Sequence, residues 1–287
     1  MIGNSGSKLR ALIELTRFEH GLMVVLAIVI GALSSGELPL NINLALASLS
    51  GLLVEIGIFT LNDYLNVAED SVNKPWRPIV RGDVSKGEAL MLSSIALCSA
   101  PLISLPLLFD GLTYAFAILI TALVLGLAYD VKLKKLPLIG HCSVAFSTAL
   151  PFMYGSYLAR GPTPLTLSFF ILAFLASLSR EIIKGVQDIE GDRRAGIKSL
   201  AVLYGPSLTL KYAFAIMVIA IVMSPLPLLF IRNRIAYMLM ITPSDYLLAR
   251  ASLIALRSPK GRDLERSRRL SLIGMGLGMV AFLIASL

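Results

Sequence analysis

The sequence predicts an all-α membrane protein with about nine transmembrane helices. Of its 287 residues, 56% are hydrophobic and 15% are charged, and the mean hydropathy is +0.79. A soluble domain is usually about 45–50% apolar and about 25% charged. The excess apolar residues stand in blocks close to the ~20 residues that cross a bilayer, with cations between them. We therefore expect a single transmembrane domain over residues 1–287.

The apolar blocks define the elements in order. Residues 1–17 are short and mixed in character, which predicts an amphipathic helix lying on the membrane surface. Spans are then predicted over 19–36, 42–62, 88–109, 112–130, 138–159, 164–186, 209–231, 235–256 and 270–287. The eighth carries Pro243 and Asp245 in its middle, and an unbroken span and a broken or interfacial segment both stay open there.

Lysine and arginine gather in alternate loops. One side holds Lys8, Arg10, Arg17, Lys74, Arg77, Arg81, Lys86, Lys132, Lys134, Lys135, Arg193, Arg194, Lys198, Lys211 and the basic stretch 257–269; the opposite loops hold Arg160, Arg232 and Arg234. Positive loops face the cytoplasm, so we expect a multi-pass protein of the cell membrane with the basic side inside. This asymmetry accounts for the net charge of +8, and we expect no nucleic-acid partner.

Polar residues gather where the second predicted span ends. Asn62, Asn66 and Asp70 fall on one face of a helix, and Asp63 stands beside that face. Carboxylate and amide oxygens are the ligands that Mg²⁺ takes in proteins, usually together with substrate phosphates. The alternative is a helix end that is simply solvated.

A second polar motif ends the sixth predicted span. Arg180, Lys184, Asp188 and Asp192 are spaced by four and share one face. Charge at the centre of a bilayer costs about 2.5–3.5 kcal/mol per residue on insertion scales, which predicts a polar cavity. There the carboxylates would hold a metal and the cations would bind phosphate oxygens. The alternative is a stripe of internal salt bridges.

The loop after the first motif is basic and rigid. It carries Lys74, Arg77 and Arg81 around two prolines, and arginine presents a planar fork that suits phosphate. The alternative is ordinary charge that orients the chain. Two acidic motifs, each followed by cations, together indicate a metal-bridged polyphosphate.

These motifs resemble those of the UbiA superfamily of intramembrane prenyltransferases. Its Asn-Asp-x-x-Asp-x-x-x-Asp motif corresponds to Asn62, Asp63, Asn66 and Asp70, and its Lys/Arg-Pro-x-Arg-Pro loop to the stretch 74–78. Its Asp-x-x-x-Asp motif corresponds to Asp188 and Asp192, and a Tyr, Leu-Lys and Pro between the motifs to Tyr129, Leu133, Lys134 and Pro137. Asn66 departs from the pattern, because an amide can ligate a metal but brings no negative charge.

The resemblance implies a ring of helices around a central cavity that opens to lipid. It implies Mg²⁺ as cofactor, held by Asn62, Asp63, Asn66, Asp70, Asp188 and Asp192. It implies diphosphate binding by Lys74, Arg77, Arg81, Lys132, Lys134, Arg180 and Lys184. It implies catalytic roles for Asp70, Asp188, Asp192 and Tyr129, and acceptor contacts by Arg17 and Tyr64.

Two strings, 73–79 and 180–192, are most similar to the archaeal ether-lipid branch of that superfamily. The implied reaction transfers a geranylgeranyl group from its diphosphate, through an allylic carbocation, to the lipophilic acceptor geranylgeranylglyceryl phosphate. A quinone-pathway enzyme that prenylates 4-hydroxybenzoate or a related aromatic acid is the alternative within the family. A membrane transporter is the alternative outside it, favoured by a broken eighth helix.

Overall fold

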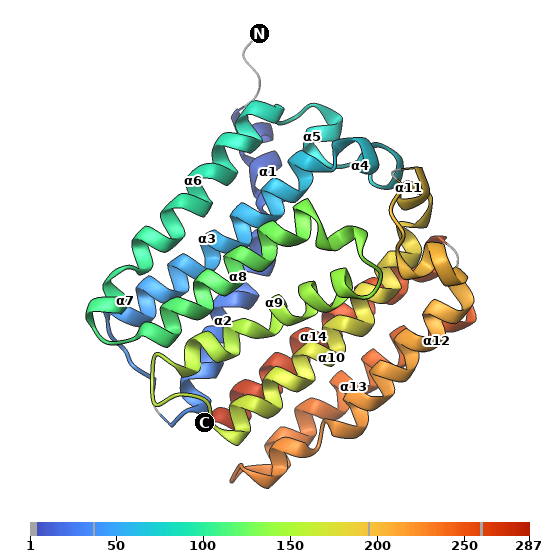
Figure 1. The fold of residues 1–287 in the computed structure, drawn as a ribbon. Helices are drawn as coiled ribbons and strands as arrows, with labels where there is room; N and C mark the ends of the chain where they lie inside the picture. The colour runs from blue at the N-terminus through green and yellow to red at the C-terminus, as the bar shows by residue number, and fades with distance from the viewer. Residues whose placement is uncertain (1–4, 37, 195, 259–260) are drawn as a thin grey trace.

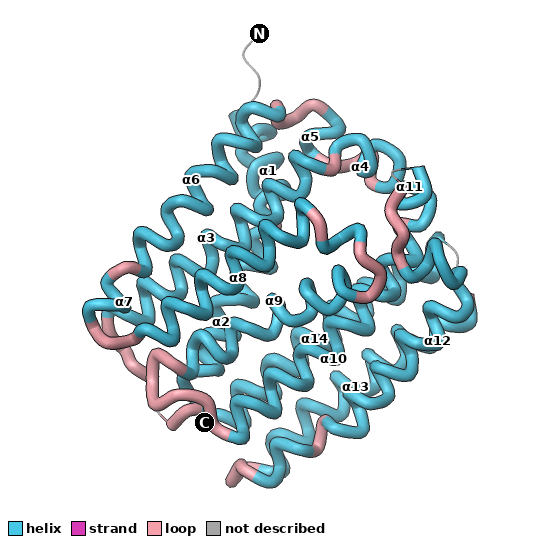
Figure 2. Tube along the Cα trace, in the orientation of Figure 1, coloured by secondary structure: helices cyan, strands magenta, loops and turns pink. Residues whose placement is uncertain are grey.

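Helices make up almost all of the computed structural model, which describes residues 5–36, 38–194, 196–258 and 261–287 (Figures 1 and 2). The first half holds α1 (Ser5–Thr16), α2 (Phe18–Ser34), α3 (Ile42–Leu65), α4 (Val67–Asn73), α5 (Pro78–Arg81), α6 (Lys86–Ser104), α7 (Pro106–Phe109) and α8 (Thr113–Val131). The second half holds η1 (Leu133–Lys135), α9 (Ile139–Ser156), α10 (Pro164–Gln187), α11 (Ile189–Arg194), α12 (Leu200–Met223), η2 (Leu226–Leu229), α13 (Arg234–Arg257) and α14 (Gly261–Ser286). The all-α prediction is confirmed, and no strand occurs in these ranges.

The protein is a multi-pass integral membrane protein. Within the described ranges, seven helices are long and apolar enough to cross a membrane, or eight if α1 and α2 form one bent span. The predicted number of nine is therefore not confirmed. The difference lies partly in α9, an 18-residue helix whose serines, threonine, histidine and proline make it less apolar than its neighbours. Such a helix suits a position inside a bundle better than one facing lipid.

Two segments are more regular than the sequence suggested. The helix α13 runs unbroken through Pro243, where Ser244 Oγ donates to the Gly274 carbonyl oxygen of α14 at 2.7 Å. The helix α14 begins at Gly261, nine residues before the predicted start of the last span. Its first turns are basic but amphipathic, because Leu264 is buried while Glu265 binds the exposed arginines that follow it.

The long helices pack side by side around a central space. α2 packs against α3, α9 and α14, and α10 packs against α9, α12 and α14. The backbones of α2 and α9 approach closely, since a Cβ on Gly31 would lie 2.0 Å from the Phe152 carbonyl oxygen. The short helices α4, α5 and α11 gather at one end of the bundle, where α4 contacts α11 (Figure 1).

The helix α1 lies at that same end and packs against α3 and α5. Its Ala11 and Leu15 are buried with Ile79, while Leu9 and Ile13 are exposed. The described part of this segment is thus amphipathic as expected, and its place at the membrane surface stays a prediction. Residues 1–4 of the predicted helix and 259–260 of the basic stretch lie outside the described ranges.

Candidate active site

A cavity of about 990 Å³ occupies the centre of the bundle. Its inner walls are apolar and include Met23, Val24, Phe59, Val144, Phe152, Leu172, Ile241, Leu248, Met279 and Phe282. Its charged lining includes Arg17, Asp63, Lys74, Arg77, Arg180, Glu181, Lys184, Asp188, Glu265, Arg268 and Arg269. An apolar pocket with convergent charged groups is the arrangement expected of a ligand site.

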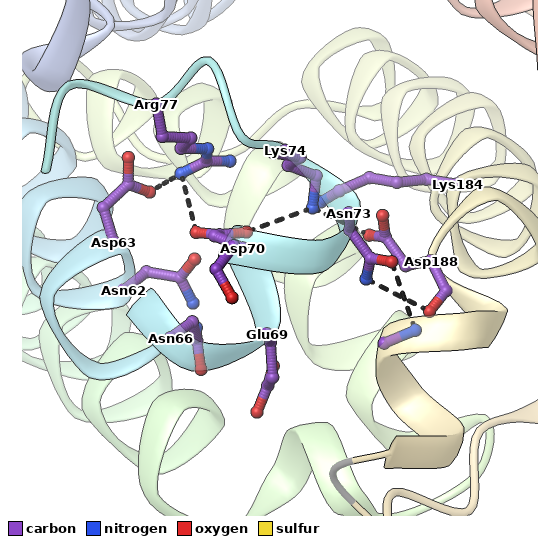
Figure 3. Close-up of polar contacts among 12 residues, drawn as sticks. Asn62, Asp63, Asn66, Glu69, Asp70, Asn73, Lys74, Arg77, Lys184 and Asp188 are labelled. Carbon is purple, nitrogen blue, oxygen red and sulfur yellow. Dashed lines mark hydrogen bonds and ion pairs between the residues drawn. The ribbon is translucent and has the colours of Figure 1, made fainter. Parts of the chain in front are cut away.

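The first motif folds around a break between two helices. α3 ends at Leu65, and Asn66 links it to α4 with a non-helical ψ of 19°. Asn62 Nδ2 donates to Asp130, and Lys134 Nζ donates to the amide oxygen of Asn66. Asn62 thus contacts the last turn of α8 and Asn66 contacts η1, whereas Asp70 lies near Arg77 and Lys74 (Figure 3).

Arg77 joins the two carboxylates of this motif. Its guanidinium forms an ion pair with Asp63, and its Nη1 lies 3.7 Å from Asp70 Oδ2. Both carboxylates are buried. Burial, reinforced by the positive charge of Arg17, lowers the pKa of Arg77 to about 9. Arg77 is thus a desolvated cation aimed at the charged end of the cavity.

The two motifs meet through Asn73 and Lys74, at the end of α4 (Figure 3). Lys74 Nζ lies 3.0 Å from Asp188 Oδ2 and 3.7 Å from Asp70 Oδ1. Asn73 Nδ2 donates to the Asp188 carbonyl oxygen at 3.3 Å, and the Gly191 backbone N–H donates to Asn73 Oδ1 at 3.1 Å. The segments are 115 residues apart in sequence, and these contacts make them one site.

Glu181 organises the cations of the second motif. It is buried on α10, its Oε2 lies 3.0 Å from Lys184 Nζ, and its Oε1 lies 3.4 Å from Arg180 Nη1. Arg180 Nε is buried without a hydrogen-bond partner in the described structure. The four residues of the predicted stripe therefore do not pair with one another. Arg180 and Lys184 pair with Glu181, while Asp188 pairs with Lys74.

The carboxylates fit a divalent cation. Asp70 Oδ2 is buried and accepts no hydrogen bond from the described residues, and burial raises the Asp70 pKa. Burial, with the charge of Asp188, raises the pKa of Asp192 to about 6. No group of three His, Cys, Asp or Glu is gathered as a preformed metal cage in the described ranges. Mg²⁺ usually binds one or two carboxylates together with substrate phosphates, so this donor set suits a site completed by substrate.

Arg17 enters the cavity at a bend of 44° between α1 and α2. Its backbone is left-handed (φ 46°), a conformation that non-glycine residues adopt at a cost. Its Nη2 donates to Asp63 Oδ1 at 2.7 Å, and its Cζ lies 4.1 Å from the Phe59 ring centroid. The bend thus delivers a cation between the charged and the apolar parts of the cavity.

Several residues predicted from the sequence do not line the cavity. Tyr64 packs in the cluster of Ala11, Leu15, Ile79, Val84 and Ala89. Arg81 pairs with Glu14, which does line the cavity, at 3.0 Å and with Asp83 at 2.7 Å. Lys132 is exposed, and Tyr129 stands in the last turn of α8 outside the lining. The predicted catalytic role of Tyr129 and the predicted substrate contacts of the other three stay predictions.

Other site residues were missed. Asn73 stood inside the quoted string 73–79, and Glu69, which pairs with Lys134 at 3.0 Å, stood beside Asp70. Glu181 stood three residues before Lys184, a spacing that predicts an ion pair. Glu55 was hidden inside an apolar span. Arg268 and Arg269 were attributed to an orienting loop, yet α14 brings both to the cavity. Only long-range packing could have revealed these last three.

Comparison with known proteins points to one family. A sequence model of the UbiA prenyltransferase family matches residues 22–273. A digeranylgeranylglyceryl phosphate synthase of Ignicoccus hospitalis is 34% identical over 98% of this chain and 93% of its own length. The protein of that name from Methanopyrus kandleri is 33% identical over 96% of this chain and 98% of its own length.

Solved structures share the fold. One described in connection with digeranylgeranylglyceryl phosphate synthase in membranes has a TM-score of 0.72 and 27% identity, over 97% of this chain and 98% of its own. A UbiA homologue from Archaeoglobus fulgidus, bound to GPP and Mg²⁺, has a TM-score of 0.65 and 20% identity, over 95% of this chain and 99% of its own. The second likeness shows the fold alone.

Proposed function

This chain belongs to the UbiA prenyltransferase family, and from that membership we propose that it transfers a geranylgeranyl group from its diphosphate to the free hydroxyl of geranylgeranylglyceryl phosphate. The product is a dialkyl ether phospholipid precursor. One observation carries the proposal: both polar motifs meet at the charged part of a cavity whose inner walls are apolar. That order of surfaces matches a diphosphate head joined to an isoprenoid tail.

The donor diphosphate binds among Lys74, Arg77 and Lys184. All three line the cavity, and all three are held in place by carboxylates before substrate arrives. Such preorganised cations stabilise the charge that builds on the leaving group, usually the largest single contribution to catalysis. Arg180 adds an unpaired Nε–H beside them.

Asp70, Asp188 and Asp192 are the residues that would hold Mg²⁺. Asp70 offers an oxygen that accepts no hydrogen bond, and Lys74 can shift from Asp188 to the substrate. When bound, the ion adds positive charge beside the leaving diphosphate. Asn62, Asn66 and Asp63 would have a supporting role, because their side chains already contact Asp130, Lys134 and Arg77, respectively.

The proposed reaction uses both the charged end and the apolar walls of the cavity. The bond between C1 and the diphosphate oxygen breaks, and its electron pair leaves with the diphosphate. The acceptor hydroxyl oxygen forms a new bond to C1 and releases its proton. Apolar side chains such as Val24, Phe59 and Phe152 exclude water, which would otherwise capture the allylic cation.

The acceptor phosphate requires cations of its own. Arg17 reaches the cavity from the α1–α2 bend, and Arg268 and Arg269 reach it from the first turns of α14. These residues come from both ends of the chain, which supports one domain over 1–287. The charged end carries the basic loops, so it faces the cytoplasm under the positive-inside rule.

A transfer assay in liposomes tests the proposal. Radiolabelled geranylgeranyl diphosphate and Mg²⁺ are supplied with geranylgeranylglyceryl phosphate and 4-hydroxybenzoate as competing acceptors. We compare the wild type with Asp188→Asn and with Glu190→Gln, a matched control two residues away whose carboxylate is exposed. We expect label on the glyceryl phosphate, abolished by Asp188→Asn and retained by Glu190→Gln.

Two results would contradict it. Label on the aromatic ring would assign the enzyme to prenylation of aromatic acids. Absence of transfer to either acceptor, in protein that still binds the donor, would show that the acceptor is a different compound.

A further inference from the structure

A third stripe of residues follows α3 down the cavity wall. Glu55, Phe59 and Asp63 are spaced by four, and all three line the cavity. Asp63 stands among the cations, where it pairs with Arg17 and Arg77. Glu55 stands about 12 Å farther along the helix axis, since each residue rises about 1.5 Å. The stripe therefore runs from the diphosphate site toward the apolar part of the cavity.

Glu55 has no direct hydrogen-bond or ion-pair partner that would explain its place. It is half-buried inside a membrane-spanning helix and forms no hydrogen bond or ion pair with any described residue. The other carboxylates that line the inner cavity are all engaged: Asp63 by Arg17, Glu181 by Lys184, Asp188 by Lys74 and Asp245 by Ser224. An isolated carboxylate at membrane depth is costly and marks a functional site.

Glu55 lies one helical turn from Phe59, the ring over which the Arg17 guanidinium lies. Arg17, whose Cζ lies 4.1 Å from the Phe59 ring centroid, supplies the attractive charge at Glu55. His20 also lines this level of the cavity, with its ring 5.4 Å from the Phe59 ring. The charged and titratable groups that line the cavity on this side are Glu14 of α1, Arg17 at the α1–α2 bend, and Glu19 and His20 of α2. Helix α10 adds Arg180, Glu181 and Lys184.

We propose that Glu55 is the catalytic base that takes the proton from the acceptor hydroxyl. This rests on the proposed function, because an alcohol that is alkylated on oxygen must lose its proton. As the C1–diphosphate bond breaks and the oxygen–C1 bond forms, the hydroxyl proton passes to the Glu55 carboxylate. Glu55 then releases this proton to solvent before the next turnover.

The test separates proton removal from binding. In the liposome assay at saturating Mg²⁺ and donor, we compare the wild type with Glu55→Gln, which keeps the shape but cannot accept the proton. We expect kcat to fall about 100-fold or more, as for loss of a general base. The acceptor KM and donor affinity should stay within about twofold, and the acidic limb of the pH–rate profile should disappear.

Two further variants control the result. Glu19→Gln removes an exposed carboxylate that also lines the cavity, and its kinetics should match the wild type. Glu55→Asp restores a carboxylate and should recover part of kcat together with the acidic limb. Water attack on the donor without acceptor, measured as diphosphate release, should be unchanged in Glu55→Gln.

The outcomes distinguish this inference from the proposed function. A Glu55→Gln enzyme with wild-type kcat, or one that loses donor binding while Glu55→Asp keeps the wild-type profile, would overturn the base role and leave the transferase assignment standing. A wild-type enzyme that transfers label to neither acceptor would overturn both.

Discussion

Lys74 Nζ lies 3.0 Å from Asp188 Oδ2, and this contact joins the loop after the first motif to the second motif, between residues 114 apart in sequence. The same ammonium is 3.7 Å from Asp70 Oδ1, so one cation neutralises a carboxylate of each motif. Without substrate, Lys74 therefore keeps two like charges close together. With substrate, it becomes available to the diphosphate.

Replacing Lys74 should have opposite effects on substrate and metal. We expect Lys74→Met to raise the donor KM by about tenfold or more, because a hydrogen bond to a charged group contributes about 1.5–3 kcal/mol. In the absence of donor, the same variant should bind Mg²⁺ more tightly, because Asp70 and Asp188 lose their shared cation. Steady-state kinetics and calorimetric Mg²⁺ titration measure the two effects. Weaker Mg²⁺ binding would contradict this assignment.

Gly191 is required by the contact that Asn73 makes with the second motif. A Cβ at this position would lie 2.0 Å from Asn73 Nδ2. We expect Gly191→Ala to destabilise the protein by about 1–3 kcal/mol, as overpacking does, and to lower transfer activity. Thermal unfolding in detergent gives the first effect and the liposome assay the second. Gly276→Ala is the matched control, since a Cβ there meets nothing within 4 Å.

Arg268 should contribute to binding of the acceptor and not to binding of the donor. We expect Arg268→Gln to raise the KM for geranylgeranylglyceryl phosphate about tenfold, with the donor KM unchanged, because the variant removes a cation from the proposed acceptor side. Arg262→Gln changes an arginine of the same helix that does not line the cavity, and it should leave both constants unchanged. An equal rise in both KM values for Arg268→Gln would place this residue with the diphosphate instead.

The Mg²⁺ requirement should depend on pH through Asp192. Burial raises the pKa of this carboxyl from 3.8 to about 6, so a proton competes with the metal below pH 6 and is absent above it. The Mg²⁺ concentration for half-maximal rate should rise by up to about tenfold per pH unit below 6 and level off above pH 7. Glu190→Gln should leave this profile unchanged, whereas Asp192→Asn should flatten it. A flat wild-type profile would remove Asp192 from the ligand set.

Some features of this protein followed from local sequence. Apolar blocks identified the spanning helices, since a bilayer admits only segments that satisfy their own backbone. The acidic motifs and their loop identified the family, because a metal-bridged diphosphate needs oxygens and cations at short spacings. Lys74, Arg77, Lys184 and Asp188 were all named in advance, and the structure brings them together. Their roles as ligands stay predictions.

Other features were decided by packing between distant segments. Asn66 breaks α3 from α4, so the expected stripe turns into contacts with Asp130 and Lys134. The first turns of α14 are helical because Leu264 is buried and Glu265 binds Arg268, which makes a basic loop into a cavity wall. In the sequence, Glu55 is a single charge in an apolar span, and only the tertiary structure places it on the cavity wall with residues of α2 and α10. Sequence spacing determines which residues share a face, but only the tertiary structure determines what that face meets.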